Sequence, residues 1–218
     1  MTTKAVLFDI DGTLVDSNYG HVAAWTAALE RLGHPVDSWR IHHAIGMDSA
    51  KLLDELLGGS ADELSDDAKA AHSEIYEAAA GHLRAFAHAR ELVAEVAHRG
   101  QRAVLATSAP ESELEILRGV LKIEDDIAAV TSAEDVETAK PAPDLVQVAL
   151  ERAGVDAGEA IFVGDSVWDV AAALESGVAC VALLSGGTGR LELLRAGAIA
   201  VYDDAADLLA NYDEHLAP

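Results

Sequence analysis

The chain has 218 residues, half of them hydrophobic, and its formal net charge is −23. That length fits one domain with a large insertion, since domains centre on about 150 residues. The excess of acids argues against nucleic acid as a partner, and no run reaches the roughly 20 apolar residues that span a membrane.

Residues 1–4 lack the apolar stretch of a signal peptide, so we expect a cytoplasmic protein. Residues 5–8 then predict a short buried strand. Asp9 and Asp11 follow it, two positions apart, which places both side chains on one side of an extended chain. Ligands of open α/β sheets bind beyond the carboxyl ends of strands. These acids therefore predict a cation site, a nucleophile or both.

No second strand is predicted before residue 102. Helical patterns occupy the interval instead, over 21–32, 49–57 and 65–86, and Asp16 and Ser17 are expected to cap the first of them. A connection this long within a domain is usually functional. We expect residues 16–86 to form an inserted α-helical cap over the end of the first strand, and residues 1–15 and 87–218 to form the core.

Beyond this interval, apolar runs alternate with helical patterns. Strands are predicted at 102–106, 128–130, 160–163, 178–183 and 198–201. Helices are predicted at 88–98, 110–121, 143–153, 169–175 and 191–196. This alternation is typical of βαβ units, so the predicted fold is α/β, with a Rossmann-like, doubly wound parallel sheet. Cys180, the only cysteine, excludes a disulfide framework and is expected to be buried in a strand.

Chemically versatile residues follow several of these strands. Thr107 and Ser108 follow the second strand, Lys140 lies before Pro141, and Asp165 and Asp169 come after the run 160–163. Carboxylates suit Mg²⁺, a hard cation, and a carboxylate can attack phosphorus to form an aspartyl phosphate. A hydroxyl and a lysine can stabilise charge on phosphoryl oxygens. The residue types are consistent with phosphoryl transfer.

A second aspartate can protonate the leaving oxygen and later activate water. For that role Asp11 must hold a proton when the substrate is bound. We expect a neighbouring carboxylate to raise the pKa of Asp11 accordingly.

In order, these segments resemble the four motifs of the haloacid dehalogenase-like hydrolase superfamily. The matching segments are Phe-Asp-Ile-Asp-Gly-Thr-Leu-Val-Asp-Ser at 8–17, Thr107-Ser108, Lys140-Pro141 and Gly-Asp-Ser-Val-Trp-Asp at 164–169. The helical insertion resembles the subgroup with an α-helical cap, which includes phosphoglycolate phosphatases and β-phosphoglucomutases. The resemblance covers nearly the whole chain, and four motifs in order are far more specific than any one alone.

The resemblance implies that Asp9 is the nucleophile and Asp11 the general acid/base. Thr107 and the backbone N–H of Ser108 would hold the phosphoryl group, and Lys140 would neutralise the negative charge of both Asp9 and the phosphate. The implied Mg²⁺ ligands are Asp9, Asp11 through its backbone carbonyl, Asp165 and, through water or by fixing its neighbours, Asp169.

Two departures separate activities within the superfamily. Dehalogenases lack the second acid of the first motif, because a halide needs no proton, so Asp11 disfavours that activity, although residues 166–169 faintly resemble a dehalogenase motif. β-Phosphoglucomutases usually carry an acid where this chain has Gly164. The expected activity is Mg²⁺-dependent hydrolysis of a small phosphorylated metabolite. A phosphomutase is the alternative and a 2-haloacid dehalogenase a weaker one; both a monomer and a homodimer are compatible.

Residues 40–51 resemble the superfamily's specificity loop, with Gly46 at its turn. Arg40, His43 and Lys51 are candidates to bind an anionic group of the substrate. Solvent exposure is expected for the histidines that fall on helical patterns, among them His72, His82, His88 and His98.

Overall fold

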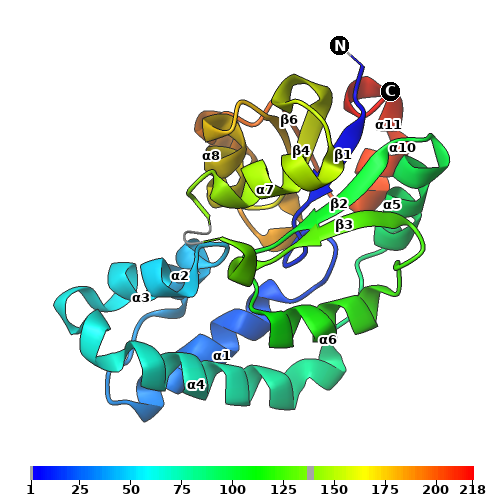
Figure 1. Cartoon of the computed structure of the whole chain (residues 1–218). Helices are drawn as coiled ribbons and strands as arrows, with labels where there is room; N and C mark the ends of the chain where they lie inside the picture. The colour runs from blue at the N-terminus through cyan, green and yellow to red at the C-terminus, as the bar shows by residue number, and fades with distance from the viewer. Residues whose placement is uncertain (1, 137–139) are drawn as a thin grey trace.

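The computed structural model describes residues 2–136 and 140–218. A six-stranded parallel sheet with the order β3-β2-β1-β4-β5-β6 forms its centre (Figure 1). The strands are β1 (Ala5–Phe8), β2 (Arg102–Ala106), β3 (Ile127–Thr131), β4 (Ala160–Gly164), β5 (Ala179–Leu183) and β6 (Ala200–Tyr202). The strand order reverses between β1 and β4, as in doubly wound Rossmann-like sheets. The predicted fold class is confirmed.

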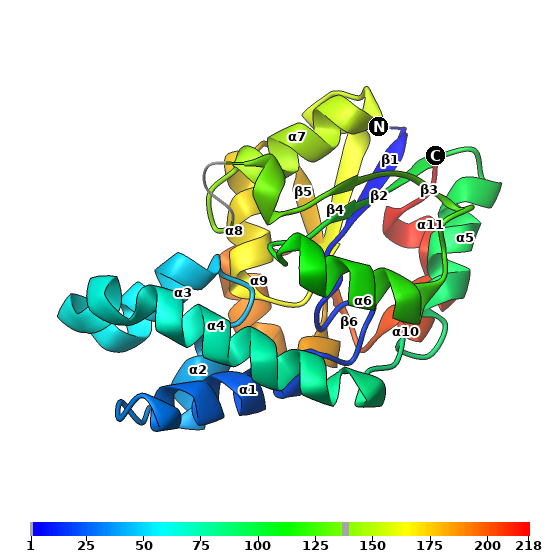
Figure 2. The same ribbon diagram turned by 60° about the horizontal axis from the view of Figure 1, so that its bottom comes forward.

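Helices cover both faces of this sheet (Figures 1 and 2). One face carries α5 (Ala89–His98), α6 (Glu111–Leu121), α10 (Ala205–Ala210) and α11 (Tyr212–His215). The other carries α7 (Asp144–Ala153), α8 (Val167–Glu175) and α9 (Arg190–Ala196). In β1, Val6 and Phe8 enter the first core while Ala5 and Leu7 enter the second. Burial on both faces explains why this strand is apolar without interruption.

Between β1 and α5 the chain forms a separate group of helices. They are α1 (Asn18–Arg31), α2 (Ser38–Ala44), α3 (Ser49–Leu57) and α4 (Ala61–Ala79), and we call residues 18–79 the helical region. Trp25, Leu29 and Leu53 belong to an apolar core within this region, distinct from the two cores of the sheet. Figure 2 shows the helical region beside the carboxyl end of the sheet. A core of its own is consistent with the predicted cap, whose exact boundaries stay a prediction.

Within residues 2–136 and 140–218 there are also five single turns of 3₁₀ helix. They are Gly58–Ser60, Ala80–His82, Ala133–Asp135, Ala157–Glu159 and Leu184–Gly186.

The structure corrects the predicted end of the last cap helix. The pattern predicted a helix to residue 86, but α4 ends at Ala79. Beyond it, Phe86 N–H donates to Leu14 O at 2.9 Å, and Asp16 N–H donates to Arg84 O at 2.9 Å. These hydrogen bonds between two segments of the chain take the place of helical ones. The two connections between the helical region and the sheet therefore lie side by side.

Some short helices escaped prediction. The helix α2 covers part of the expected loop 40–51, and α10 and α11 follow the last strand. Such segments of four to seven residues are too short for a periodic pattern to be recognised. Arg40 and His43 consequently lie on a helix rather than in a loop.

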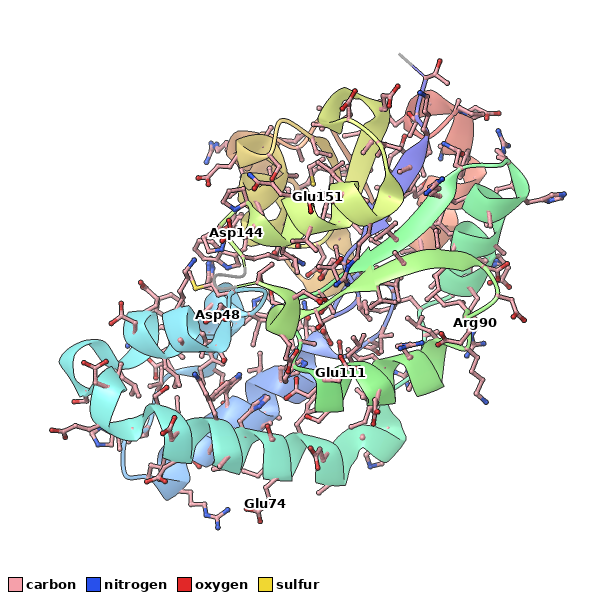
Figure 3. The ribbon with its side chains drawn as sticks, in the orientation of Figure 1. Asp48, Glu74, Arg90, Glu111, Asp144 and Glu151 are labelled. Carbon is pink, nitrogen blue, oxygen red and sulfur yellow. The ribbon has the colours of Figure 1, made fainter. Side chains whose placement is uncertain are left out.

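Much of the negative charge lies on outer surfaces. Glu74, Glu111 and Glu151 project from α4, α6 and α7 (Figure 3), and all three are exposed. Among the described residues, no helix combines the length and apolar character needed to cross a membrane.

Candidate active site

Three buried aspartates meet at the reversal point of the sheet. Asp9 follows β1, Asp165 follows β4, and Asp169 lies in the first turn of α8. One carboxylate oxygen of each lies within 4.8 Å of the others, and none of the three residues is more than 5% exposed. Because β1 and β4 are neighbours, their carboxyl ends bring these acids together although they are distant in sequence.

Local hydrogen bonds fix two of these carboxylates. Asp169 Oδ2 accepts from the Ser166 hydroxyl at 2.6 Å, within the capping box of α8. Asp165 accepts from the Thr13 hydroxyl at 2.8 Å and from Asn18 Nδ2 at 2.9 Å. Our sequence analysis did not single out Thr13 or Asn18. Thr13 lies within the first motif, which was the signal that could have indicated it, whereas Asn18 lies just beyond it.

Lys140 supplies the positive charge of this cluster. Its ammonium pairs with the Asp9 carboxylate and, at 2.8 Å, with Asp169 Oδ1, and its side chain is almost completely buried. Burial raises the pKa of Asp9, an effect that Lys140 opposes. Burial, together with Asp169 and Asp9, raises the pKa of Asp165 well above its usual value. Lys140 pairs with two of the three carboxyl groups, so ionisation of all three would leave negative charge uncompensated. A hard divalent cation such as Mg²⁺ fits this donor set.

Asp11 stands apart from the acidic cluster. Its Oδ1 accepts from the Ser17 hydroxyl at 2.6 Å and faces His21 Nε2 at 3.2 Å. Burial raises the pKa of Asp11, but the interactions with His21 and Ser17 outweigh it and leave the pKa lowered. The expectation of a raised pKa is therefore wrong in this structure, because an imidazole and a hydroxyl surround Asp11 where a carboxylate was expected.

Ser17 corrects a second expectation. It occupies the N-cap position of α1, yet its side chain makes no capping hydrogen bond. The Ser17 hydroxyl donates to Asp11 instead. Ser17 and His21 are one helical turn apart, so both can face the same group. That spacing after the first motif was the available signal for His21.

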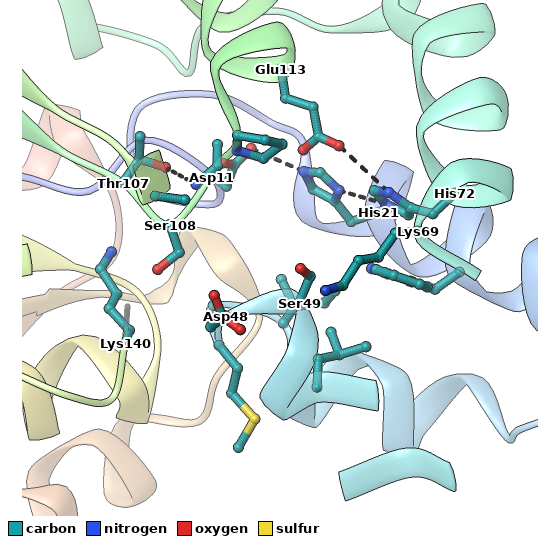
Figure 4. Close-up of a pocket in the computed structure, with 18 of the residues that line it drawn as sticks. Asp11, His21, Asp48, Ser49, Lys69, His72, Thr107, Ser108, Glu113 and Lys140 are labelled. Atoms are coloured by element: carbon teal, nitrogen blue, oxygen red, sulfur yellow. Dashed lines mark hydrogen bonds and ion pairs between the residues drawn. The ribbon is translucent and has the colours of Figure 1, made fainter. Parts of the chain in front are cut away.

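A cavity of about 260 Å³ opens beside the acidic cluster (Figure 4). Asp9, Asp11, Thr107, Ser108 and Lys140 line one end of it. Thr107 Oγ1 accepts the Ala109 N–H at 3.0 Å. The buried Ser108 hydroxyl has no hydrogen-bond partner within the described residues, so it is available to a ligand. The structure thus gathers the predicted strand-end residues around one open space.

The helical region lines the other end of the cavity. Its contributions include Trp25, Leu52, Lys69, His72 and Ser73, together with the turn at Gly46. At Gly46 the backbone φ is +96°, and a Cβ would lie 2.8 Å from Ser166 Oγ, so glycine is needed for this turn to approach the sheet.

The other predicted cap residues lie elsewhere. Arg40 donates to the carbonyl of Glu55 at 3.3 Å, near the end of α3. His43 is exposed and lies 3.7 Å from Glu192. Neither of them, nor Lys51, is among the described residues that line the cavity. Of the residues predicted from 40–51, the structure brings only Gly46 to the cavity.

His72 corrects the prediction of exposed histidines, whereas His82, His88 and His98 are exposed as expected. His72 is 5% exposed, and its ring stacks on Trp25 at a centroid distance of 4.1 Å. Burial and the neighbouring His21 lower its pKa to about 3, which leaves the imidazole uncharged. A helical pattern alone does not show that α4 turns this face toward α1.

A parallel sheet with buried acids and a lysine at its carboxyl edge defines an α/β enzyme whose active site lies at the reversal point. The chain belongs to the haloacid dehalogenase-like hydrolase family, whose family model matches residues 3–177.

Known relatives cover most of the chain. It is 34% identical over 217 residues to a phosphoglycolate phosphatase of Rhodospirillum rubrum, covering 94% of this chain and 89% of that protein. A phosphoglycolate phosphatase of Pseudomonas savastanoi pv. phaseolicola is 30% identical over 213 residues, covering 94% and 78%. The crystal structure of a hydrolase from Pseudomonas syringae has a TM-score of 0.93 and 35% identity over 100% of both chains. The predicted family, fold and hydrolase class are confirmed, and the two curated relatives are phosphatases by name.

Proposed function

We propose that this protein is an Mg²⁺-dependent phosphatase that hydrolyses a small phosphate monoester through an aspartyl phosphate at Asp9. The observation that carries this proposal is the buried Asp9–Asp165–Asp169 cluster with Lys140 at the end of an open cavity. Asp11 lies at the same end and supplies a separate carboxyl group for proton transfer.

The residues divide the work as follows. An Asp9 oxygen attacks phosphorus, the bond to the leaving oxygen breaks, and Asp11 gives that oxygen its proton. A water then attacks the phosphoryl group, Asp11 takes up the water's proton, and Asp9 is released. Thr107, Ser108 and Lys140 would bind the phosphoryl oxygens throughout. Mg²⁺, when held by Asp9, Asp165, Asp169 and the Asp11 carbonyl, would supply charge neutralisation for the phosphoryl group.

Gly164 supports hydrolysis over a mutase reaction. A Cβ at this position would lie 2.5 Å from Asp169 Cγ, well inside contact distance. The acid that β-phosphoglucomutases usually carry here would displace Asp169 and disturb its pairing with Lys140. The presence of Asp11 supports a leaving group that needs a proton, which separates this site from a haloacid dehalogenase.

For the substrate we propose 2-phosphoglycolate or a similar small carboxylate-bearing phosphate ester. The curated relatives are phosphoglycolate phosphatases by name, and the volume of about 260 Å³ suits a small molecule. Lys69 lines the cavity opposite Lys140, and Figure 4 shows its ammonium near Ser49. Lys69 has no ion-pair partner among the residues described, so a substrate carboxylate can pair with it.

Hydrolysis of 2-phosphoglycolate and of p-nitrophenyl phosphate tests the proposal. We expect activity with Mg²⁺ and loss of activity with EDTA. Asp9→Asn should lower kcat by at least about 10³-fold, since it removes the nucleophile. Full activity of Asp9→Asn would refute the mechanism.

A further inference from the structure

A buried chain of ionisable side chains extends from Asp11 across the cavity wall (Figure 4). His21 Nε2 lies 3.2 Å from Asp11 Oδ1, and His21 Nδ1 lies 3.1 Å from His72 Nε2. His72 Nδ1 in turn lies 3.5 Å from Glu113 Oε1. The reaction proposed above uses only the first member of this chain.

The two end members of this series of side chains lie outside the helical region. Asp11 follows β1 and Glu113 lies on α6, whereas His21 and His72 come from α1 and α4. The Tyr76 ring stacks on His21 at 4.0 Å between centroids, and Trp25 stacks on His72. Both imidazoles are therefore held in plane by aromatic neighbours. All four side chains of the series are in contact only while the helical region packs against the sheet.

The burial of the Glu113 carboxyl group requires an explanation. Glu113 is 4% exposed, and burying a carboxyl group is costly unless it is well paired. Burial raises the pKa of Glu113 to about 7. The imidazole of His72, at 3.5 Å, is the one basic group that contacts this carboxyl group among the described residues.

The Asp11–His21 and His21–His72 contacts are hydrogen bonds, and the His72–Glu113 contact of 3.5 Å becomes one when the two groups draw together. The positions of the protons are restricted, because each hydrogen bond needs one donor and one acceptor. In one arrangement His21 is a cation that donates to both Asp11 and His72, and His72 donates from Nδ1 to an ionised Glu113. In the other, a protonated Glu113 donates to His72, which donates from Nε2 to a neutral His21. The two hold the same number of protons, and in both His21 donates from Nε2 to Asp11. A third arrangement with this proton count has Asp11 donating to a neutral His21, which requires His72 to donate from Nδ1 to an ionised Glu113. A protonated Glu113 excludes it, because His72 must then accept at Nδ1 and donate from Nε2.

The fixed Nε2–H matters when Asp11 carries its proton. If a neutral His21 carried its proton on Nδ1, its unprotonated Nε2 would face Asp11 as a hydrogen-bond acceptor. Asp11 would then donate to His21 and not to the leaving oxygen. With Nε2–H in place, Asp11 can only accept from His21, so its own proton points to the substrate.

We propose that His72 and Glu113 are positioning residues that act through His21 to direct the Asp11 proton to the leaving group. This inference rests on the proposed phosphatase function. It predicts a defect that depends on the leaving group, because an alkoxide needs a proton to depart whereas p-nitrophenolate departs without one.

His72→Phe tests the proposal, because it keeps an aromatic ring between Trp25 and Tyr76 and removes both nitrogens. We expect kcat/KM for 2-phosphoglycolate, or for whichever alkyl phosphate the wild type prefers, to fall by about 10- to 100-fold. The value for p-nitrophenyl phosphate should fall by less than about 3-fold. Equal proportional losses on both esters, or no loss on either, would overturn the proposal.

Conservative variants separate positioning from packing. His72→Gln offers an amide donor to His21 and should recover part of the loss on the alkyl ester. Glu113→Gln keeps a donor to His72 and should be milder than Glu113→Leu. His98→Phe is the matched control, because His98 forms an exposed pair with Glu95 at 4.0 Å on α5. It should leave both substrates unaffected, and an equal defect in this control would count against a role specific to His72.

The ring nitrogens can be followed without any activity. In ¹⁵N-histidine-labelled protein, long-range ¹H–¹⁵N spectra should show His21 protonated at Nε2 in the wild type. In His72→Phe the Nδ1 signal of His21 should shift, because that nitrogen loses its hydrogen-bond partner. Unchanged His21 signals would overturn the proposal. A wild type that hydrolyses neither ester with Mg²⁺, yet shows these shifts, would instead refute the phosphatase function.

Discussion

The two ends of the cavity are built in different ways. At the sheet end, Asp9, Asp165 and Asp169 are buried and lie on or next to short strand-to-helix turns. Hydroxyl groups of nearby residues hold two of these carboxylates in place. At the helical end, Lys69 is half-buried and apolar side chains share the wall with serines. A crowded, charged end suits the chemical step, whereas a roomier end with one available cation suits selection among substrates. Variants at the two ends should therefore differ in which kinetic constant they change.

Gly164→Ala should have the largest effect of the variants that leave every ionisable group in place. Its Cβ would lie 2.5 Å from Asp169 Cγ, so Asp169 must move away from Lys140 and the cation site. We expect kcat to fall by about 10- to 100-fold, because misplacement by about 1 Å costs on that order. Steady-state kinetics over a range of Mg²⁺ concentrations measures this.

Gly158→Ala is the matched control, because nothing lies within 4 Å of the added methyl group. Wild-type kinetics in Gly164→Ala would show that the sheet end tolerates displacement, contrary to the contrast drawn above.

Lys69→Met should change binding and spare the chemical step. Losing one ion pair to a carboxylate should raise KM for 2-phosphoglycolate by about 10-fold, with kcat changed less than about 3-fold. For p-nitrophenyl phosphate, which lacks a carboxylate, KM should stay within about 2-fold of the wild type. Lys122→Met removes the same charge from an exposed position outside the cavity. A fall in kcat for both esters in Lys69→Met would place this lysine in the chemical step.

The smallest expected effect is on stability. Burial raises the pKa of Asp9 and Asp165 above the ordinary value of 3.8, so the metal-free folded protein holds protons that the unfolded chain releases. Its stability should fall as pH rises above about 4 and through these raised pKa values. Mg²⁺ at 100 times its Kd adds about 2.7 kcal/mol, which corresponds to a rise in Tm of roughly 5–10 °C.

The Mg²⁺-induced rise in Tm should be larger at pH 8 than at pH 5, because protons compete with the cation at low pH. Thermal unfolding with Mg²⁺ and with EDTA at both pH values measures it. A rise that is greater at pH 5 would contradict a cation held by these carboxylates.

The same contrast explains what the sequence could predict. Asp9, Thr107 and Asp165 each follow an apolar strand, and the carboxyl ends of parallel strands meet by necessity, so motif and topology together indicate one site. His72 and Lys69 reach the cavity through the way α4 packs against α1, which no local pattern encodes, and for His21 the spacing after Ser17 was the one local signal. For this reason Arg40, His43 and Lys51 were chosen by their charge and lie elsewhere, while the buried His72 was expected at the surface.

The stereochemical course at phosphorus tests the central claim most directly. A substrate whose phosphoryl group is chiral by oxygen isotopes can be hydrolysed in isotopic water and the product phosphate analysed. Attack by Asp9 followed by attack of water gives two inversions, so the account predicts overall retention of configuration. Overall inversion would show a single direct attack by water and would contradict the aspartyl phosphate.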